Sequence, residues 1–209
     1  MLHLQQFQKS YGAAPVLTIP DWQLPTGLHW LKGPNGAGKT TLFRSIAGML
    51  PFDGIIMLND FDCRRDAISY RLRVNYAEAE PTFPPFLTAH ELIRWVAEAK
   101  RAPTGQADAL IELFGVGTYL HTPVGTYSSG MLKKTSLIIA FLGQPTLMLL
   151  DEPLVTLDVA ATQTVIGLIE TARQQGVSFL LSSHQTGKTA QLPINSVWRV
   201  ADKTVVRDE

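Results

Sequence analysis

The segment that most constrains how this chain can fold is Gly33 to Thr40, which reads GPNGAGKT. It matches the pattern GxxxxGK followed by Ser or Thr at every fixed position. An apolar run from Gly27 to Lys32 precedes the loop, and helical spacing of apolar residues follows it from Thr40 to Leu50. In this order of strand, loop and helix, backbone N–H groups and the positive end of the helix converge on phosphate oxygens. A chance glycine-rich turn would not bring both flanking elements, so we predict a phosphate-binding loop.

Two side chains of the loop are suited to a nucleotide. Lys39 can reach terminal phosphates with its ammonium group, and the hydroxyl of Thr40 can ligate Mg²⁺. The glycines let the backbone curl so that successive N–H groups point at the same phosphates. Kinases, GTPases and many motors share such a loop, so by itself it predicts phosphate binding and no particular reaction.

A second apolar run, Leu147 to Leu150, ends abruptly in the carboxylates Asp151 and Glu152. The carboxyl ends of strands in a parallel sheet converge on the ligand. Asp151 is therefore a candidate for holding Mg²⁺, and Glu152 for accepting a proton from the attacking water. In isolation the pair also fits a strand end followed by a helix cap, which is a common arrangement. Beside a phosphate-binding loop, the catalytic interpretation is favoured.

The apolar pattern predicts an α/β fold. Strands at Leu2 to Phe7 and Val16 to Ile19 are expected to form an antiparallel layer at the N-terminus. A helix from about Val159 to Gln175, followed by a buried strand at Val177 to Leu181, continues the run that ends at Asp151. This alternation of strand, helix and strand predicts a mainly parallel sheet. From Thr88 to Leu120 the spacing is helical.

The length of 209 residues suits one domain. We expect a single domain over residues 1–209, in which residues 1–80 and 140–209 form the core and residues 81–139 form a helical subdomain. The longest apolar stretch, Leu137 to Leu150, is interrupted and falls short of the ~20 residues needed to span a bilayer. A membrane role is therefore expected to come through a partner.

Charge and cysteine content narrow the function classes. The chain has 18 basic and 18 acidic residues, so it lacks the electrostatic footprint of a nucleic-acid-binding protein, and no nucleic-acid partner is expected. Cys63 is the single cysteine, which excludes an intrachain disulfide and fits a reducing cytoplasm.

With these motifs in place, the chain resembles the ABC ATPase family, because further elements appear in that family's order. Tyr127 to Met131, which reads YSSGM, resembles the family's signature sequence at the start of a helix. Thr156 to Asp158 resembles the D-loop, and Leu181 to His184 resembles the switch-histidine loop. Tyr11 resembles the aromatic residue on which adenine stacks. The family fold is a P-loop ATPase core with a mainly parallel sheet, an N-terminal antiparallel β layer and a helical subdomain.

The resemblance implies an ATP hydrolase that uses ATP and Mg²⁺ and powers a membrane transporter. In this family, two ATPase subunits close head to tail over two ATP molecules, and the signature sequence contacts the γ-phosphate held by the opposite subunit. The implied partners are a second ABC ATPase subunit, identical or different, and a transmembrane permease that docks near the helical region. The implied location is cytoplasmic, at the inner face of the membrane. Short chains with a signature like YSSGM resemble exporter subunits.

The resemblance also assigns roles to individual residues. The catalytic residues would be Lys39, Glu152 and His184, and the metal ligands Thr40 and Asp151. The residues implied to contact ATP are Tyr11, Gly33, Pro34, Asn35, Gly36, Ala37, Gly38, Lys39, Thr40, Thr41, Ser128, Ser129, Gly130 and Asp158.

The chain departs from the family pattern at two places. Ser129 stands where the signature usually has glycine, which adds a side chain near the phosphate contact. No glutamine occurs between Gln23 and Gln106, so the Q-loop glutamine is missing, and its position falls on Ala79. One of the flanking glutamates, Glu78 or Glu80, could replace it as a water-mediated metal contact, since carboxylates suit Mg²⁺. A solvated acidic loop without a catalytic part is equally consistent with the sequence.

Two other functions would use the same phosphate-binding loop. The first is a soluble ABC ATPase of DNA repair or translation. Such family members are long chains with coiled-coil inserts or two ATPase units, and this sequence contains neither. A small-molecule phosphotransferase built on the same loop would explain neither Tyr127 to Gly130 nor His184. We therefore expect a transporter ATPase.

Overall fold

The computed structural model describes residues 1–183 and 192–208. The helices are α1 (Lys39–Ile46), α2 (Ala67–Arg73), α3 (Ala89–Ala99), α4 (Gln106–Phe114), α5 (Ser129–Ala140) and α6 (Val159–Gln174), with a short 3-10 helix η1 (Val124–Thr126). The strands are β1 (Leu2–Tyr11), β2 (Ala14–Leu24), β3 (Leu28–Lys32), β4 (Asp53–Leu58), β5 (Phe61–Asp62), β6 (Val74–Ala77), β7 (Leu147–Asp151), β8 (Ser178–Ser182), β9 (Ser196–Ala201) and β10 (Thr204–Asp208).

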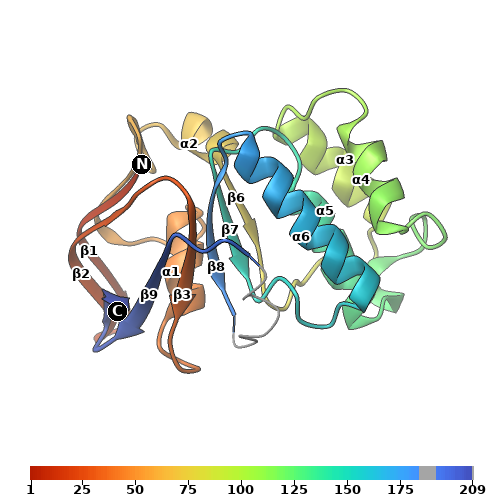
Figure 1. The fold of residues 1–209 in the computed structure, drawn as a ribbon. Helices are drawn as coiled ribbons and strands as arrows, with labels where there is room; N and C mark the ends of the chain where they lie inside the picture. The colour runs from red at the N-terminus through yellow and green to blue at the C-terminus, as the bar shows by residue number, and fades with distance from the viewer. Residues whose placement is uncertain (184–191, 209) are drawn as a thin grey trace.

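The strands form two sheets (Figure 1). The larger sheet has the order β10-β9-β3-β8-β7-β6, and its pairs from β9 to β6 are parallel. Strand β10 closes one edge antiparallel to β9. The smaller sheet, β2-β1-β4-β5, is antiparallel throughout. These two sheets confirm the predicted α/β fold with a mainly parallel sheet and an antiparallel N-terminal layer.

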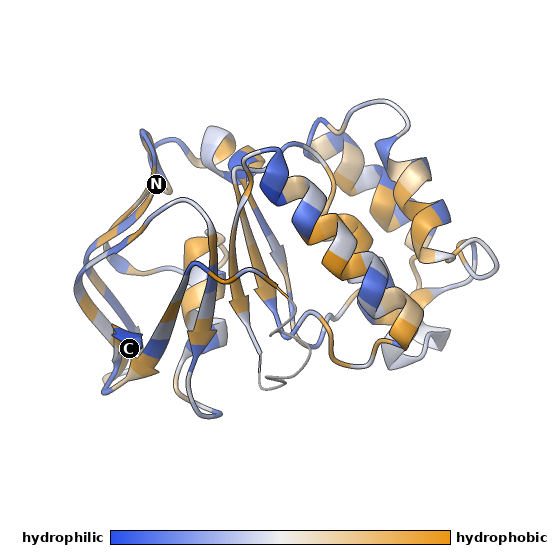
Figure 2. Cartoon of the chain, in the orientation of Figure 1, coloured by the Kyte–Doolittle hydropathy of each residue, from blue (hydrophilic) through white to orange (hydrophobic). Residues whose placement is uncertain are grey.

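Strand β7 shows how the parallel sheet is buried on both faces. Leu147 and Leu149 belong to a core shared with the small sheet and α1, whereas Met148 and Leu150 belong to a core shared with helices α3 to α6. Successive side chains of a strand point to opposite faces, so a strand covered on both sides is apolar at every position. Figure 2 shows the hydrophobic colour along the central strands. Asp151, the last residue of this run, therefore stands at the carboxyl end of the parallel strands.

Helix α1 is shorter than the apolar spacing predicted, because it ends at Ile46 and not near Leu50. Gly48 takes the left-handed conformation, with φ of 70°. Its N–H donates to Ser45 O at 3.0 Å, and the N–H of Met49 donates to Arg44 O at 2.9 Å. This pair of bonds is the Schellman motif, which ends a helix at a glycine.

Three of the other helices begin at polar caps. Thr88 and Glu91 form a reciprocal capping box at the start of α3. Ser128 accepts a hydrogen bond from the N–H of Met131 at the start of α5, and Asp158 accepts one from Ala161 at the start of α6. Each cap satisfies a backbone N–H that has no partner within its helix.

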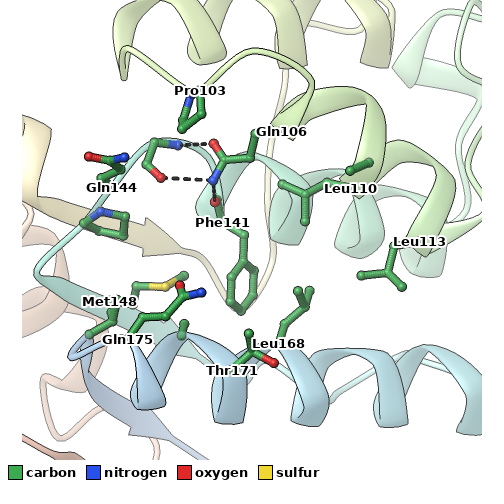
Figure 3. A pocket seen from close by; sticks show the side chains of 15 residues that line it. Pro103, Gln106, Leu110, Leu113, Phe141, Gln144, Met148, Leu168, Thr171 and Gln175 are labelled. Atoms are coloured by element: carbon green, nitrogen blue, oxygen red, sulfur yellow. Dashed lines mark hydrogen bonds between the residues drawn. The ribbon is translucent and has the colours of Figure 1, made fainter.

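Gln106, the first residue of α4, joins this helix to the loop between α5 and β7 (Figure 3). Its side-chain amide donates to Phe141 O at 3.3 Å and Gly143 O at 3.0 Å, and accepts from the N–H of Gly143 at 2.7 Å. These bonds lie beside a mainly apolar cavity of about 650 Å³ between α4 and α6.

Across residues 1–183 and 192–208, no helix has the length and apolar character required to cross a membrane.

Candidate nucleotide-binding site

A cleft of about 610 Å³ lies where the end of β1, the loop before α1, the segment after β6 and the end of β7 meet. This volume lies in the range of ordinary small-molecule sites. The predicted site residues that line it are Tyr11, Asn35, Gly36, Gly38, Lys39, Thr40, Thr41, Asp151 and Glu152. The chain therefore brings the phosphate-binding loop and the paired carboxylates to the same cleft, although they are far apart in the sequence.

The loop before α1 curls around the side chain of Lys39. The ammonium of Lys39 donates to Gly33 O at 2.7 Å and Pro34 O at 3.1 Å. Burial lowers the pKa of Lys39, while the nearby Asp151 and Glu152 carboxylates act in the opposite direction. The two carboxylates therefore favour the charged ammonium, which is the form that compensates the charge of a phosphate.

Gly38 has φ of 103° just before α1, a conformation that residues with side chains rarely adopt. A Cβ at this position would lie 3.2 Å from the side chain of Leu17. The backbone conformation therefore favours glycine here, and a side chain would in addition crowd Leu17 of β2.

Asp151 is buried at the end of β7, and two hydroxyl groups hold its carboxylate. Thr40 Oγ1 donates to Asp151 Oδ2 at 2.6 Å, and Ser182 Oγ donates to Asp151 Oδ1. The sequence-predicted metal ligands Thr40 and Asp151 are thus direct neighbours. Ser182, at the end of β8, was not predicted as a site residue.

Glu152 follows with φ of 47°, in the left-handed region. Its N–H lies 3.2 Å from Ser182 O and 3.1 Å from Ser182 Oγ. A residue other than glycine in this conformation carries a cost of about 1 kcal/mol or more, which the surrounding structure has to outweigh. The predicted switch histidine, His184, lies outside the described residues.

The signature and D-loop residues form a second group. Ser128, Ser129 and Gly130 stand at the start of α5, and a Cβ on Gly130 would lie 3.1 Å from Thr156 O. Lys134 Nζ lies 3.0 Å from Asp158 Oδ2. The N–H of Ala161 and the side chain of Lys134 lower the pKa of Asp158. Among the residues that the structure describes, those lining the cleft do not include Ser128 to Gly130 or Asp158.

The segment Glu78 to Glu80, where the missing Q-loop glutamine was predicted to fall, lines two different pockets. Ala79 and Glu80 line the cleft, whereas Glu78 lines a separate groove and pairs with Arg44 of α1 at 3.1 Å. Lys133 of α5 donates to the backbone carbonyls of Glu78, Ala79 and Asp151. Burial lowers the pKa of Lys133 to about 8, against the effect of nearby carboxylates.

Arg44, Lys133 and Ser182 were missed as site residues by sequence reasoning. Lys133 stands in the basic pair that follows the signature sequence, which is the one local signal that could have drawn attention to it.

The residues of the cleft fit ATP with Mg²⁺. Mg²⁺ is usually held by one or two carboxylates, a hydroxyl, water and the phosphates of the substrate. The hydroxyl of Thr40 and the carboxylate of Asp151 supply such oxygen ligands side by side. Within the described part of the chain, no group of three or more His, Cys, Asp or Glu residues could hold a metal ion without a substrate. This donor set suits an ion that arrives with the nucleotide.

The fold and the cleft define a P-loop nucleotide-binding ATPase of the α/β class. Residues 21–155 match the family described as ABC transporter, and the chain belongs to this family. It is an ATP-binding subunit of the ABC type, an ATPase that powers a membrane transporter.

Similar proteins carry names of transport ATPases, in accord with this family. The chain is 34% identical to the cytochrome c biogenesis ATP-binding export protein CcmA of Legionella pneumophila, over 93% of this chain and 96% of the relative. It is 28% identical to the lantibiotic transport ATP-binding protein SrtF of Streptococcus pyogenes, over 88% of this chain and 80% of the relative.

Solved structures share the fold. The ATP-binding subunit of an ABC transporter superposes with a TM-score of 0.89 at 25% identity, over 100% of this chain and 89% of the other. A dimeric ATP-binding cassette in a post-hydrolysis state, bound to ADP and Pi, superposes with a TM-score of 0.86 at 16% identity, over 100% and 98%.

Proposed function

We propose that this chain hydrolyses ATP with Mg²⁺ in sites completed by a second ABC ATPase subunit, and that hydrolysis drives export through a transmembrane permease. The observation that carries this proposal is the separation of two groups of residues. Lys39 and Asp151 line the cleft, whereas Ser128 to Gly130 stand beside Thr156 at the start of α5, away from the described lining. The start of a helix offers free N–H groups to an anion. These N–H groups suit a phosphate held by another subunit.

The residues of the cleft then divide the work of hydrolysis. Lys39 and the loop N–H groups compensate the charge of the phosphates. Thr40 and Asp151 hold Mg²⁺, which, when bound, neutralises charge that develops on the phosphate oxygens. Glu152 accepts a proton from the water that attacks the γ-phosphate. His184 is proposed to help position that water, as the family resemblance implies.

Tyr11 is proposed to stack on adenine. Its side chain is 53% exposed at the end of β1 and lines the cleft. The ammonium of Lys9 lies 4.9 Å from the centre of the ring. Stacking of a base on an exposed aromatic ring contributes about 1–3 kcal/mol in other proteins.

An exposed apolar side chain beside the D-loop supports the proposed pairing of two ATPase subunits. Val159, the residue after Asp158, is 80% exposed at the start of α6. Burial of this side chain against a partner would remove apolar surface from water. The proposed partner is a second ABC ATPase subunit, identical or different.

The permease is proposed to dock in a groove of about 750 Å³ that runs between α2 and α3. Met49 and Ile68 line the groove with exposed fractions of 58% and 75%, and Phe83 is half-buried in its wall. The exposed Phe86 and Trp95 lie on the helical region that was predicted to dock a permease. Phe114, on α4 of the same region, is buried in the core and offers no docking surface. Exposed apolar patches of this kind mark interaction sites.

The proposed domain plan assigns residues 81–139 to a helical subdomain within the single domain 1–209, with residues 1–80 and 140–209 as the core. The names of two relatives, an export protein and a lantibiotic transport protein, support an exporter. We place the chain at the cytoplasmic face of the membrane, bound to its permease.

Affinity purification of the tagged chain from detergent-solubilised membranes of its own host tests this function. We expect a multispanning membrane protein to co-purify with the chain, and ATP hydrolysis to be measurable in the complex. Ile68→Asp should weaken the association because it charges the proposed groove. Val206→Asp, at an exposed apolar residue of β10, is the matched control and should bind as the wild type does. Recovery of an active chain without a membrane protein would contradict the proposal.

A further inference from the structure

Lys133 is one of the most deeply buried charged residues described, with 1% of its surface exposed. It belongs to α5, which begins at Ser129. A buried ammonium group is costly unless each of its three N–H donors has a partner. Lys133 Nζ has three acceptors, the carbonyl oxygens of Glu78 at 2.8 Å, Ala79 at 3.1 Å and Asp151 at 3.1 Å.

These three carbonyls belong to two neighbouring strand ends. Glu78 and Ala79 directly follow β6, and Asp151 is the last residue of β7. The two strands pair in parallel, with Ala77 opposite Leu150. The ammonium group therefore links α5 to both strand ends at the edge of the cleft.

The bond to Asp151 acts on the peptide unit that precedes Glu152. Lys133 holds the carbonyl of this peptide unit, and Ser182 O and Oγ lie within 3.2 Å of its N–H. Both polar groups of one peptide plane are thus fixed from opposite sides. Glu152 has φ of 47°, which persists only where surrounding contacts determine it.

We propose that Lys133 is a positioning residue for ATP hydrolysis, which fixes the peptide unit between Asp151 and Glu152 and joins it to the segment at Ala79. Lys133 acts through backbone carbonyls and does not line the described cleft. The segment at Ala79 is the place where the family carries glutamine, so Lys133 connects this segment to the catalytic carboxylates without a glutamine side chain. This inference rests on the proposed function of Glu152.

The test compares Lys133→Met with Lys100→Met, the loss of a second, half-buried lysine whose ammonium group also donates to backbone carbonyls. Lys100 Nζ donates to Val74 O at 2.9 Å and to Arg71 O, and it joins the end of α3 to the start of β6, away from the cleft. Both variants keep a long unbranched side chain and lose their bonds to carbonyls. Lys133→Arg retains a charged donor and serves as the conservative variant.

We expect Lys133→Met to lower kcat by about 100-fold, the scale of a small misplacement of catalytic groups, with little change in KM. Lys100→Met should keep the wild-type kcat, and Lys133→Arg should recover part of the lost activity. Wild-type kcat in Lys133→Met, or an equal loss of kcat in Lys100→Met, would overturn the positioning role.

Hydrogen exchange supplies a readout that does not depend on hydrolysis. Amides of residues 77–82 and 150–154 should exchange faster in Lys133→Met than in Lys100→Met at equal global stability. Equal exchange in the two variants would overturn the inference. If Lys133→Met does not fold, the same comparison is made with Lys133→Arg, in which altered geometry should still raise exchange in these two segments alone. Absence of ATP hydrolysis in the wild type would instead count against the proposed function of Glu152.

Discussion

Thr40 and Asp151 are joined by a hydrogen bond of 2.6 Å from the hydroxyl to the carboxylate, across 111 positions of sequence. One residue lies in the first turn of α1 and the other at the end of β7. The bond brings a hydroxyl and a carboxylate oxygen together, and these are oxygen ligands that Mg²⁺ accepts.

Asp151→Asn should raise the Mg²⁺ concentration needed for half-maximal hydrolysis by about 10-fold to 100-fold. The amide keeps the size of the side chain and an oxygen that can accept from Thr40, but it lacks the negative charge that attracts the cation. The rate of ATP hydrolysis is measured against Mg²⁺ concentration. Asp62→Asn, at a buried carboxylate away from the cleft, is the control and should leave the Mg²⁺ dependence unchanged. Identical Mg²⁺ dependence in Asp151→Asn and the wild type would contradict the assignment.

Glu152→Gln should bind ATP, hydrolyse it about 10²-fold to 10⁴-fold more slowly and accumulate as a closed dimer. Glutamine keeps the shape of the side chain and loses the ability to accept the proton of the attacking water. Turnover and light scattering with and without ATP measure the two effects.

Glu170→Gln, at an exposed glutamate of α6, is the matched control for this experiment. It should hydrolyse ATP at the wild-type rate. A Glu152→Gln protein that stays monomeric with ATP and turns over at full rate would falsify the assigned roles.

Glu80→Ala should change the Mg²⁺ dependence of hydrolysis, whereas Glu78→Ala should not. Glu80 lines the cleft beside Ala79, but Glu78 is held in an ion pair with Arg44 at 3.1 Å. Both variants are assayed over the same range of Mg²⁺ concentrations, and each serves as the control for the other. If the two variants and the wild type give one curve, neither glutamate replaces the missing glutamine.

Much of the cleft could be predicted from the sequence because strands β3 and β7 are buried on both faces. Such strands are continuous apolar runs, and the first polar residues after them mark the carboxyl ends of the strands, where a ligand binds. This reasoning located Asp151, and the glycine-rich pattern after β3 located Lys39; the structure places both in one cleft. The end of α1 was predicted less well, since apolar spacing continued past the glycine that stops the helix.

Other features carried little or no sequence signal. The turn between β9 and β10 places Asp202 and Lys203 at φ of 48° and 63°, so a hairpin forms without the glycine that usually marks one. Lys133 has the character of a surface residue in sequence, and its acceptors are backbone carbonyls of residues at least 18 positions away. Carbonyl groups are present at every residue, so no side-chain pattern could reveal this contact.

Lys100 should make the free energy of unfolding depend on pH in alkaline solution. Burial, together with the nearby charge of Arg71, lowers the pKa of Lys100 from 10.5 to about 8. Between these two values the unfolded chain binds the proton and the folded chain does not, so stability rises as pH increases. Below the lower value the folded chain holds a buried charge, and this cost is present in full.

The wild type should therefore gain about 1–2 kcal/mol relative to Lys100→Met between about pH 7.5 and about pH 9.5. Urea unfolding of both proteins at the two pH values gives this difference directly. The pKa of Lys133 is also lowered, but this residue is present in both proteins, so its contribution to the pH dependence cancels in the comparison. Lys9→Met, at a lysine on β1 remote from α3, is the control and should track the wild type at both pH values. A parallel response of the wild type and Lys100→Met would mean that Lys100 keeps its ordinary pKa, because its ammonium group would then be solvated in the folded chain.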